Sequence, residues 1–172
     1  MELENNNALK ETALIALLAA ILFVQQILLS FIPNVSFTVL LLFLYSKILG
    51  FRKTAIIILI HVTAINLLSP FGPLLPVHIP SMIFGWLIIP IFLTTIFKKV
   101  EDPFTLAFLG LIHGFIYGWV YIPVSVFLLD IPFKEYFLMD LIFEVIMAVS
   151  SFVTILWLYK PLYKFLEKQL DK

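Results

Sequence analysis

The side chains that could do chemistry in this chain are polar and aromatic groups set inside long apolar segments. His113, Tyr117 and Tyr121 recur every four residues, so on a helix they share one face. Asp140 and Glu144 are also four residues apart and share a face. Two carboxylates placed in this way could bind a cationic ligand or one with several hydrogen-bond donors, and the positive end of the helix dipole would help Asp140.

Each of these residues also has a structural interpretation. His113 suits ligand contact and a satisfied packing histidine equally well. Asp140 could be a helix acid at the water interface, whereas the deeper Glu144 favours a functional role because acids within a bilayer are costly. Trp86 could stack on a flat ring, although aromatic belts and cores are the commoner places for membrane tryptophans.

Motifs for catalysis and cofactor binding are missing from the sequence. There is no phosphate-binding loop, no G-x-S-x-G elbow and no H-E-x-x-H pair, so we expect no enzyme activity and no cofactor. The chain has no cysteine, and its three histidines, His61, His78 and His113, lie in different segments. We therefore expect no metal site.

The composition indicates an integral membrane protein. Of the 172 residues, 62% are hydrophobic and 13% charged, against about 25% charged in soluble domains. Lys and Arg (11) balance Asp and Glu (11), so no basic field exists to hold nucleic acid. These numbers exclude soluble enzymes and nucleic-acid-binding proteins.

The apolar segments predict an all-α domain, residues 1–172, with six transmembrane helices. Backbone groups in lipid must pair within their own segment, and a bilayer needs roughly 20 helical residues per span. The predicted spans lie near residues 12–32, 35–50, 54–69, 79–97, 104–121 and 136–159. The second and third are short. The first is too long for a typical export signal, so we expect it to be retained.

The positions of Lys and Arg predict the orientation. With the N-terminus inside, the cytoplasmic segments hold ten of these residues and the external side holds only Lys134. Both termini are therefore expected in the cytoplasm. The tail 160–172 could lie along the inner interface as an amphipathic helix, or it could be the solvated end of the last span.

Polar residues gather in the outer halves of these spans, which predicts a pocket that opens outward. A channel would need a polar lining through both halves. The predicted substrate-binding residues are Asn66, His78, Trp86, His113, Tyr117, Tyr121, Asp140 and Glu144. Other members of the outer polar set are Gln25, Gln26, Asn34 and Thr38. The proline-rich loop 69–80 could be a lid over the opening or an apolar connector in the headgroup region.

Two stripes of small residues could bring helices close together. Gly110, Gly114 and Gly118 form one stripe, for which ordinary helix packing is the favoured role. Thr12, Ala16 and Ala20 form another at the cytoplasmic end of the first span. That stripe could pack within the bundle or dock a partner subunit.

These features together resemble the substrate-binding S component of energy-coupling factor transporters. The resemblance rests on the six-span plan, the alanine-rich segment 13–20, the proline-rich external loop and the aromatic fifth and sixth spans. It implies a protein of a bacterial or archaeal cell membrane that captures a vitamin or related micronutrient from outside. It also implies docking through the alanine motif, here Ala16 and Ala20 with Thr12 in place of a third alanine, to a transmembrane coupling subunit and two ATPases.

Two other functions fit the same span pattern. A structural subunit similar to the rod-shape factor MreD would use the small-residue stripes to hold a membrane assembly together and would bind no solute. Such a scaffold has no need of Asn66, His113, Asp140 and Glu144 around one cavity. A secondary transporter usually shows inverted repeats, and the two halves of this chain show none that is convincing.

Overall fold

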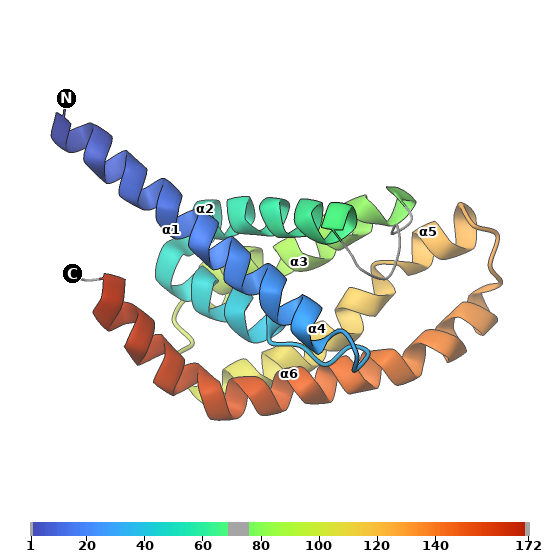
Figure 1. Cartoon of the computed structure of the whole chain (residues 1–172). Helices are drawn as coiled ribbons and strands as arrows, with labels where there is room; N and C mark the ends of the chain where they lie inside the picture. Colours follow the sequence, from blue (N-terminus) through green and yellow to red (C-terminus); the bar gives the residue numbers. More distant parts are fainter. Residues whose placement is uncertain (1, 69–75, 171–172) are drawn as a thin grey trace.

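The computed structural model describes residues 2–68 and 76–170, and this part of the chain is helical, with no strand. Figure 1 shows the order of its elements. They are α1 (Glu2–Leu29), α2 (Thr38–Leu68), the short 3-10 helix η1 (Pro76–His78), α3 (Ile79–Thr94), α4 (Pro103–Trp119), α5 (Ile122–Phe127) and α6 (Phe133–Leu170). The prediction of an all-helical chain is confirmed for these residues.

Helix α2 contains most of the predicted second and third spans, which follow one another without a loop between them. Its only non-helical residue is Gly50, with φ 77° and ψ −177°. This region of backbone space is essentially restricted to glycine. In Figure 1 the two parts of α2 run in opposite directions from this point. The break predicted over residues 51–53 is therefore wrong in its extent, because those residues are helical and a single glycine makes the reversal.

The other helix boundaries also differ from those of the predicted spans, for example at the C-terminal ends of the helices. Helix α1 ends at Leu29 and α3 at Thr94, three residues before the predicted ends of these spans. Helix α6 is longer than the predicted 136–159, because the lysine-rich tail continues it through Pro161 to Leu170. Figure 1 shows α6 changing direction in this last part, where proline removes a backbone hydrogen bond.

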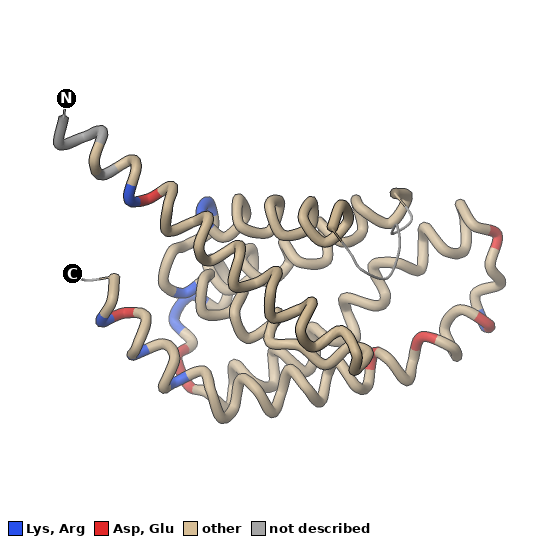
Figure 2. The backbone as a smooth tube through the Cα atoms, in the orientation of Figure 1, with Lys and Arg blue, Asp and Glu red and all other residues tan. Residues whose placement is uncertain are grey.

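The charges are distributed unevenly along the bundle. Figure 2 shows Lys and Arg concentrated at the end that also carries both termini. There Lys47 Nζ donates to the carbonyl oxygens of Phe97 (2.7 Å) and Lys98 (3.1 Å), which ties α2 to the α3–α4 connection. Toward the opposite end, α6 begins with an acidic first turn. Most cations thus lie at one end of the molecule, whereas acids lie at both ends: Glu11 pairs there with Lys53 (3.1 Å), and Glu135 lies at the opposite end.

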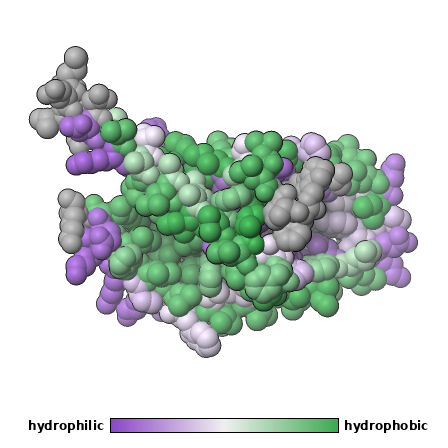
Figure 3. Space-filling view, in the orientation of Figure 1, coloured by the Kyte–Doolittle hydropathy of each residue, from purple (hydrophilic) through white to green (hydrophobic). Residues whose placement is uncertain are grey.

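Within residues 2–68 and 76–170, five helical segments are long and apolar enough to cross a membrane: α1, α2, η1 with α3, α4 with α5, and α6. Figure 3 shows an apolar belt between hydrophilic ends, and large apolar side chains such as Leu17 (59% exposed) lie on its surface. A soluble protein rarely exposes so wide an apolar surface. The chain is a multi-pass membrane protein by this criterion.

Helix α4 packs against α6 through its glycine stripe. A Cβ added at Gly114 would lie 2.5 Å from the Cα of Ala148, and one at Gly110 would meet the side chain of Ile155. Real Cβ atoms do not come this close to backbone, so α4 and α6 approach more closely than larger residues would permit. The stripe serves helix packing, as predicted.

Asp102 caps the N-terminus of α4. Its Oδ2 accepts hydrogen bonds from the backbone N–H of Thr105 (2.8 Å) and from the Thr105 hydroxyl (2.9 Å). These bonds lower the pKa of the Asp102 carboxyl below its ordinary value, because they favour the ionised form. The cap fixes where α4, which carries His113 and Tyr117, begins.

Candidate functional site

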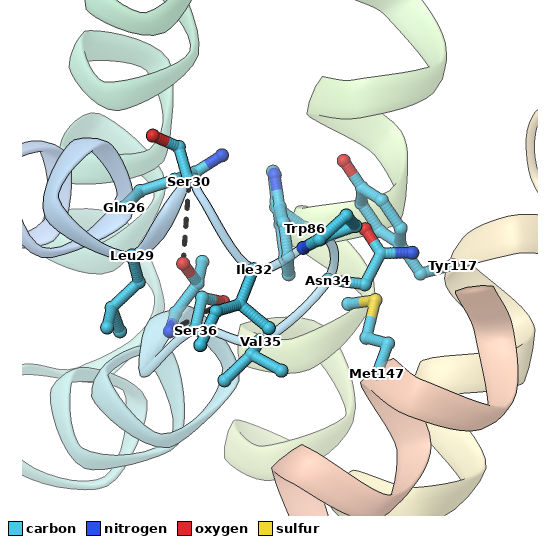
Figure 4. A pocket seen from close by; sticks show the side chains of 12 residues that line it. Gln26, Leu29, Ser30, Ile32, Asn34, Val35, Ser36, Trp86, Tyr117 and Met147 are labelled. Atoms are coloured by element: carbon cyan, nitrogen blue, oxygen red, sulfur yellow. Dashed lines mark hydrogen bonds between the residues drawn. The ribbon is translucent and has the colours of Figure 1, made fainter.

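Two adjoining cavities lie where the loop 30–37 meets α3, α4 and α6. The larger has a volume of about 250 Å³ and the smaller about 160 Å³. Both are lined by Asn34, Tyr117 and Met147, which shows that they share a wall. Figure 4 shows the larger cavity, with Trp86, Tyr117 and Asn34 around it. Together the cavities reach the lower end of the size range of small-molecule sites, which begins at about 300 Å³.

An aromatic wall separates these cavities from the core. The rings of Trp86 and Tyr117 have centroids 4.2 Å apart, and those of Tyr117 and Tyr121 are 5.3 Å apart. The two tyrosine hydroxyls are hydrogen-bonded at 2.8 Å. Because Trp86 and Tyr117 already touch, a flat ligand has no space between them and would have to lie against the wall.

Gly85 packs against the Tyr117 ring of this aromatic wall, and His78 adjoins its Tyr121 end. A Cβ at Gly85 would lie 2.8 Å from Tyr117 Cδ2, so the glycine gives the tyrosine ring its space. The ring of His78, in η1, lies 5.4 Å from that of Tyr121, and its Nδ1 is buried without a hydrogen-bond partner. His78 thus reaches the site through Tyr121 and does not itself line either cavity.

His113 lies behind the aromatic wall. Its ring is 5.9 Å from Trp86 and 6.1 Å from Tyr117, and the residue is buried. It lines a separate apolar cavity of about 180 Å³ with side chains of α3 and α4. His113 Nε2 has no hydrogen-bond partner. The structure therefore places this histidine where it supports Trp86 rather than where it touches the contents of the two adjoining cavities.

The carboxylates of Asp140 and Glu144 line the smaller cavity together with Tyr136. Glu144 is only 3% exposed, and its Oε2 has no hydrogen-bond partner. A Cβ at Gly118 would collide with its carboxylate, so the glycine stripe also makes space for this acid. The Tyr136 hydroxyl is 3.5 Å from Asp140 Oδ2, a long hydrogen bond. No Lys or Arg of the described residues lines either cavity.

The loop 30–37 covers the larger cavity and is anchored by Gln25. Gln25 Oε1 accepts from the backbone N–H of Phe37 (2.8 Å), and its Nε2 donates to Thr38 Oγ1 (2.8 Å). Within the loop, Asn34 has φ 58°, a left-handed conformation that asparagine adopts more readily than most residues. The sequence indicated the outer position of these polar residues, but not that Asn34 reaches both cavities.

Asn66 lies apart from the cavities. Its Nδ2 donates to the carbonyl of Val62 (2.7 Å) and contacts Met82 Sδ (3.5 Å), so it packs α2 against α3. The proposed lid, residues 69–80, lies largely outside the described residues. Its last part, from Pro76, forms η1 and the start of α3.

The face of α1 that carries Thr12, Ala16 and Ala20 is exposed. The Thr12 hydroxyl donates to the carbonyl of Ala8 (2.9 Å), within the same helix. The opposite face of α1 is buried and carries Leu18 and Leu22. In the described structure the three residues are exposed, so the stripe is open to lipid or to another protein.

The arrangement is suited to binding. It offers carboxylates, a buried indole N–H and aromatic surfaces, and among the described residues no group of three or more His, Cys, Asp or Glu is placed to hold a metal ion. Comparison with protein-family models, with curated proteins and with solved structures finds no match to this chain.

Proposed function

We propose that this protein is a membrane-embedded binding subunit that captures a small micronutrient, such as a vitamin, from outside the cell. The observation that carries the proposal is a set of buried polar atoms without a partner at the two cavities. Among the described residues that line the cavities these atoms are Glu144 Oε2 and Trp86 Nε1, in residues that are 3% and 4% exposed. A buried polar group without a hydrogen bond costs about 1–3 kcal/mol. A ligand that supplies these bonds offsets that cost.

The proposal includes a topology of six spans. Helix α2 crosses twice, turning at Gly50, and local thinning of the bilayer accommodates its short first part. All Lys and Arg except Lys134 are assigned to the end with both termini, which the positive-inside rule places in the cytoplasm of a bacterial or archaeal cell. The two cavities then open toward the outside.

Transport requires partners in this proposal, because the chain has no motif that couples to an energy source. The exposed stripe of Thr12, Ala16 and Ala20 would dock a transmembrane coupling subunit that works with two ATPases, as in the S components that the sequence resembles. A solute leaves the site when docking changes the packing around it.

A structural subunit similar to MreD is the second candidate, and the exposed α1 stripe favours it equally. Such a subunit gives no reason for burying Glu144 beside a cavity, since a buried carboxylate oxygen without a hydrogen bond, such as Oε2, only weakens a scaffold. The cavities therefore distinguish the two functions.

The test is native mass spectrometry of the full-length protein purified in mild detergent. We expect a small molecule to remain bound to the wild type and to be reduced at least tenfold in Glu144→Gln. Glu135→Gln is the matched control, because Glu135 lies in the first turn of the same helix but is exposed. Equal retention in both variants, or no retained molecule in the wild type, would contradict the binding function and favour the structural one.

A further inference from the structure

The charges around the two cavities are unbalanced. Asp140 and Glu144 line the smaller cavity, and no Lys or Arg of the described residues lines either one. The lysines instead concentrate at the opposite end of the bundle. The site therefore contains two acids with no cation of the protein to pair with them.

Local groups of the protein do not replace that missing cation. The helix dipole acts within the first turn, so the N-terminus of α6 at Phe133 is too far away to serve Glu144. The hydroxyl of Tyr136 is directed to Asp140, at 3.5 Å, and leaves Glu144 Oε2 without a hydrogen bond. A buried carboxylate in this state needs a charged or hydrogen-bonding partner from elsewhere.

The aromatic wall favours a cation as this partner. Tyr117 and Tyr121 line the same cavity as the two acids, and Tyr117 with Trp86 also lines the larger cavity. Ring faces carry partial negative charge and attract cations. Independently of the acids, the buried Nε1 of Trp86 lacks a hydrogen-bond partner and offers a donor to the rest of the ligand. An anion would meet two carboxylates and several ring faces, all of which repel it.

We propose that the ligand carries a positively charged nitrogen that pairs with Glu144 and Asp140 against the tyrosines, while its uncharged part occupies the larger cavity. This inference rests on the proposed binding function and specifies its substrate class. Neutral groups surround the larger cavity, among them Gln26, Ser30, Asn34 and Ser36. They can bond a polar or heterocyclic body of either donor or acceptor character.

The test uses three probes of similar size: benzylammonium, benzyl alcohol and benzoate. Each is added at the same millimolar concentration and ionic strength to the full-length protein in detergent, and the thermal midpoint of unfolding is measured. We expect benzylammonium alone to raise the midpoint, because a ligand that binds only the native state stabilises it. Its apparent Kd should increase at least tenfold in Glu144→Gln and in Asp140→Asn, and remain unchanged in Glu135→Gln.

Several results would overturn the inference. One is a shift with benzyl alcohol or benzoate as large as that with benzylammonium. Another is a benzylammonium affinity in both Glu144→Gln and Asp140→Asn equal to that of the wild type. Asp140 is half-exposed, so its substitution is the less disruptive of the two for folding. If mass spectrometry identifies a retained molecule that is neutral or anionic, the charge assignment fails while the binding function stands. If nothing is retained and no probe binds, both fail.

Discussion

The small-residue stripes of α4 and α1 have the same spacing and opposite surroundings. On α4 the stripe is covered by α6, so closely that a Cβ at Gly114 would lie 2.5 Å from backbone. On α1, Thr12, Ala16 and Ala20 are exposed. A stripe that permits close approach therefore does not say which helix approaches. The covered stripe builds the site, whereas the open one is available for a contact outside the chain.

The largest effect should come from filling the covered stripe. Gly114→Ala should cost about 1–3 kcal/mol, because overpacking against the Ala148 backbone forces α4 and α6 apart, and Gly114→Leu should cost more. The matched control is Ala16→Leu on the open stripe, which should stay within about 0.5 kcal/mol. Thermal unfolding in detergent measures both. Similar losses in the two variants would show that α1 is covered as well.

Gly50 allows the effect of backbone conformation on stability to be measured without an effect of packing. Nothing lies within 4 Å of a Cβ at Gly50, yet its φ of 77° is unfavourable for any other residue. Gly50→Ala should therefore cost about 1–3 kcal/mol through backbone strain alone. The neighbouring exposed Phe51→Ala is the control for a change at the same turn. An unaltered unfolding midpoint in Gly50→Ala would mean that the reversal does not need this conformation.

A smaller effect is expected at the cap of α4. Asp102→Ala should lower stability slightly at neutral pH, because the hydrogen bonds from Thr105 are lost. The pKa of Asp102 is lowered in the folded state, so its contribution is present above the ordinary pKa of aspartate and disappears as the pH falls through the folded value. Unfolding midpoints measured from neutral to acid pH should converge for wild type and variant. A difference that grows toward acid pH would contradict this sign.

The smallest effect on stability should come from the open stripe itself. Ala16→Trp should leave the unfolding midpoint and ligand retention unchanged, because the position is exposed. It should nevertheless abolish co-purification with the coupling subunit that we propose, since a bulky ring prevents close helix contact. The control is Leu17→Trp, at the next exposed position on α1. Normal co-purification of Ala16→Trp would exclude this face as the docking site.

Hydropathy predicted where most helices lie because lipid leaves the backbone few alternatives. It could not predict that α2 reverses at one residue, since the charged residues after Gly50 look like a loop but are helical. The prediction from depth and spacing brought together Tyr117, Tyr121, Asp140 and Glu144, which do line one cavity. The depth of a residue in the membrane does not show on which side of a neighbouring aromatic ring its side chain lies.

His113 and Asn34 show the two limits of that approach. Helical periodicity placed His113 on the face of Tyr117, yet the Trp86 ring of another helix stands in front of it. Asn34 belongs to the outer polar set, but its position in the sequence does not show that the folded loop brings it to both cavities. Contacts between segments distant in sequence decided both positions.

The anchoring of the loop 30–37 by Gln25 has a consequence for how the site could open. The groups that form this anchor are uncharged: the side-chain amide of Gln25, the backbone N–H of Phe37 and the hydroxyl of Thr38. Changes in ionic strength should therefore have little effect on these hydrogen bonds, whereas salt would weaken an exposed ion pair. The loop is joined to α1 at one end and held by these hydrogen bonds at the other, so an opening of the larger cavity by loop movement would involve residues 30–36.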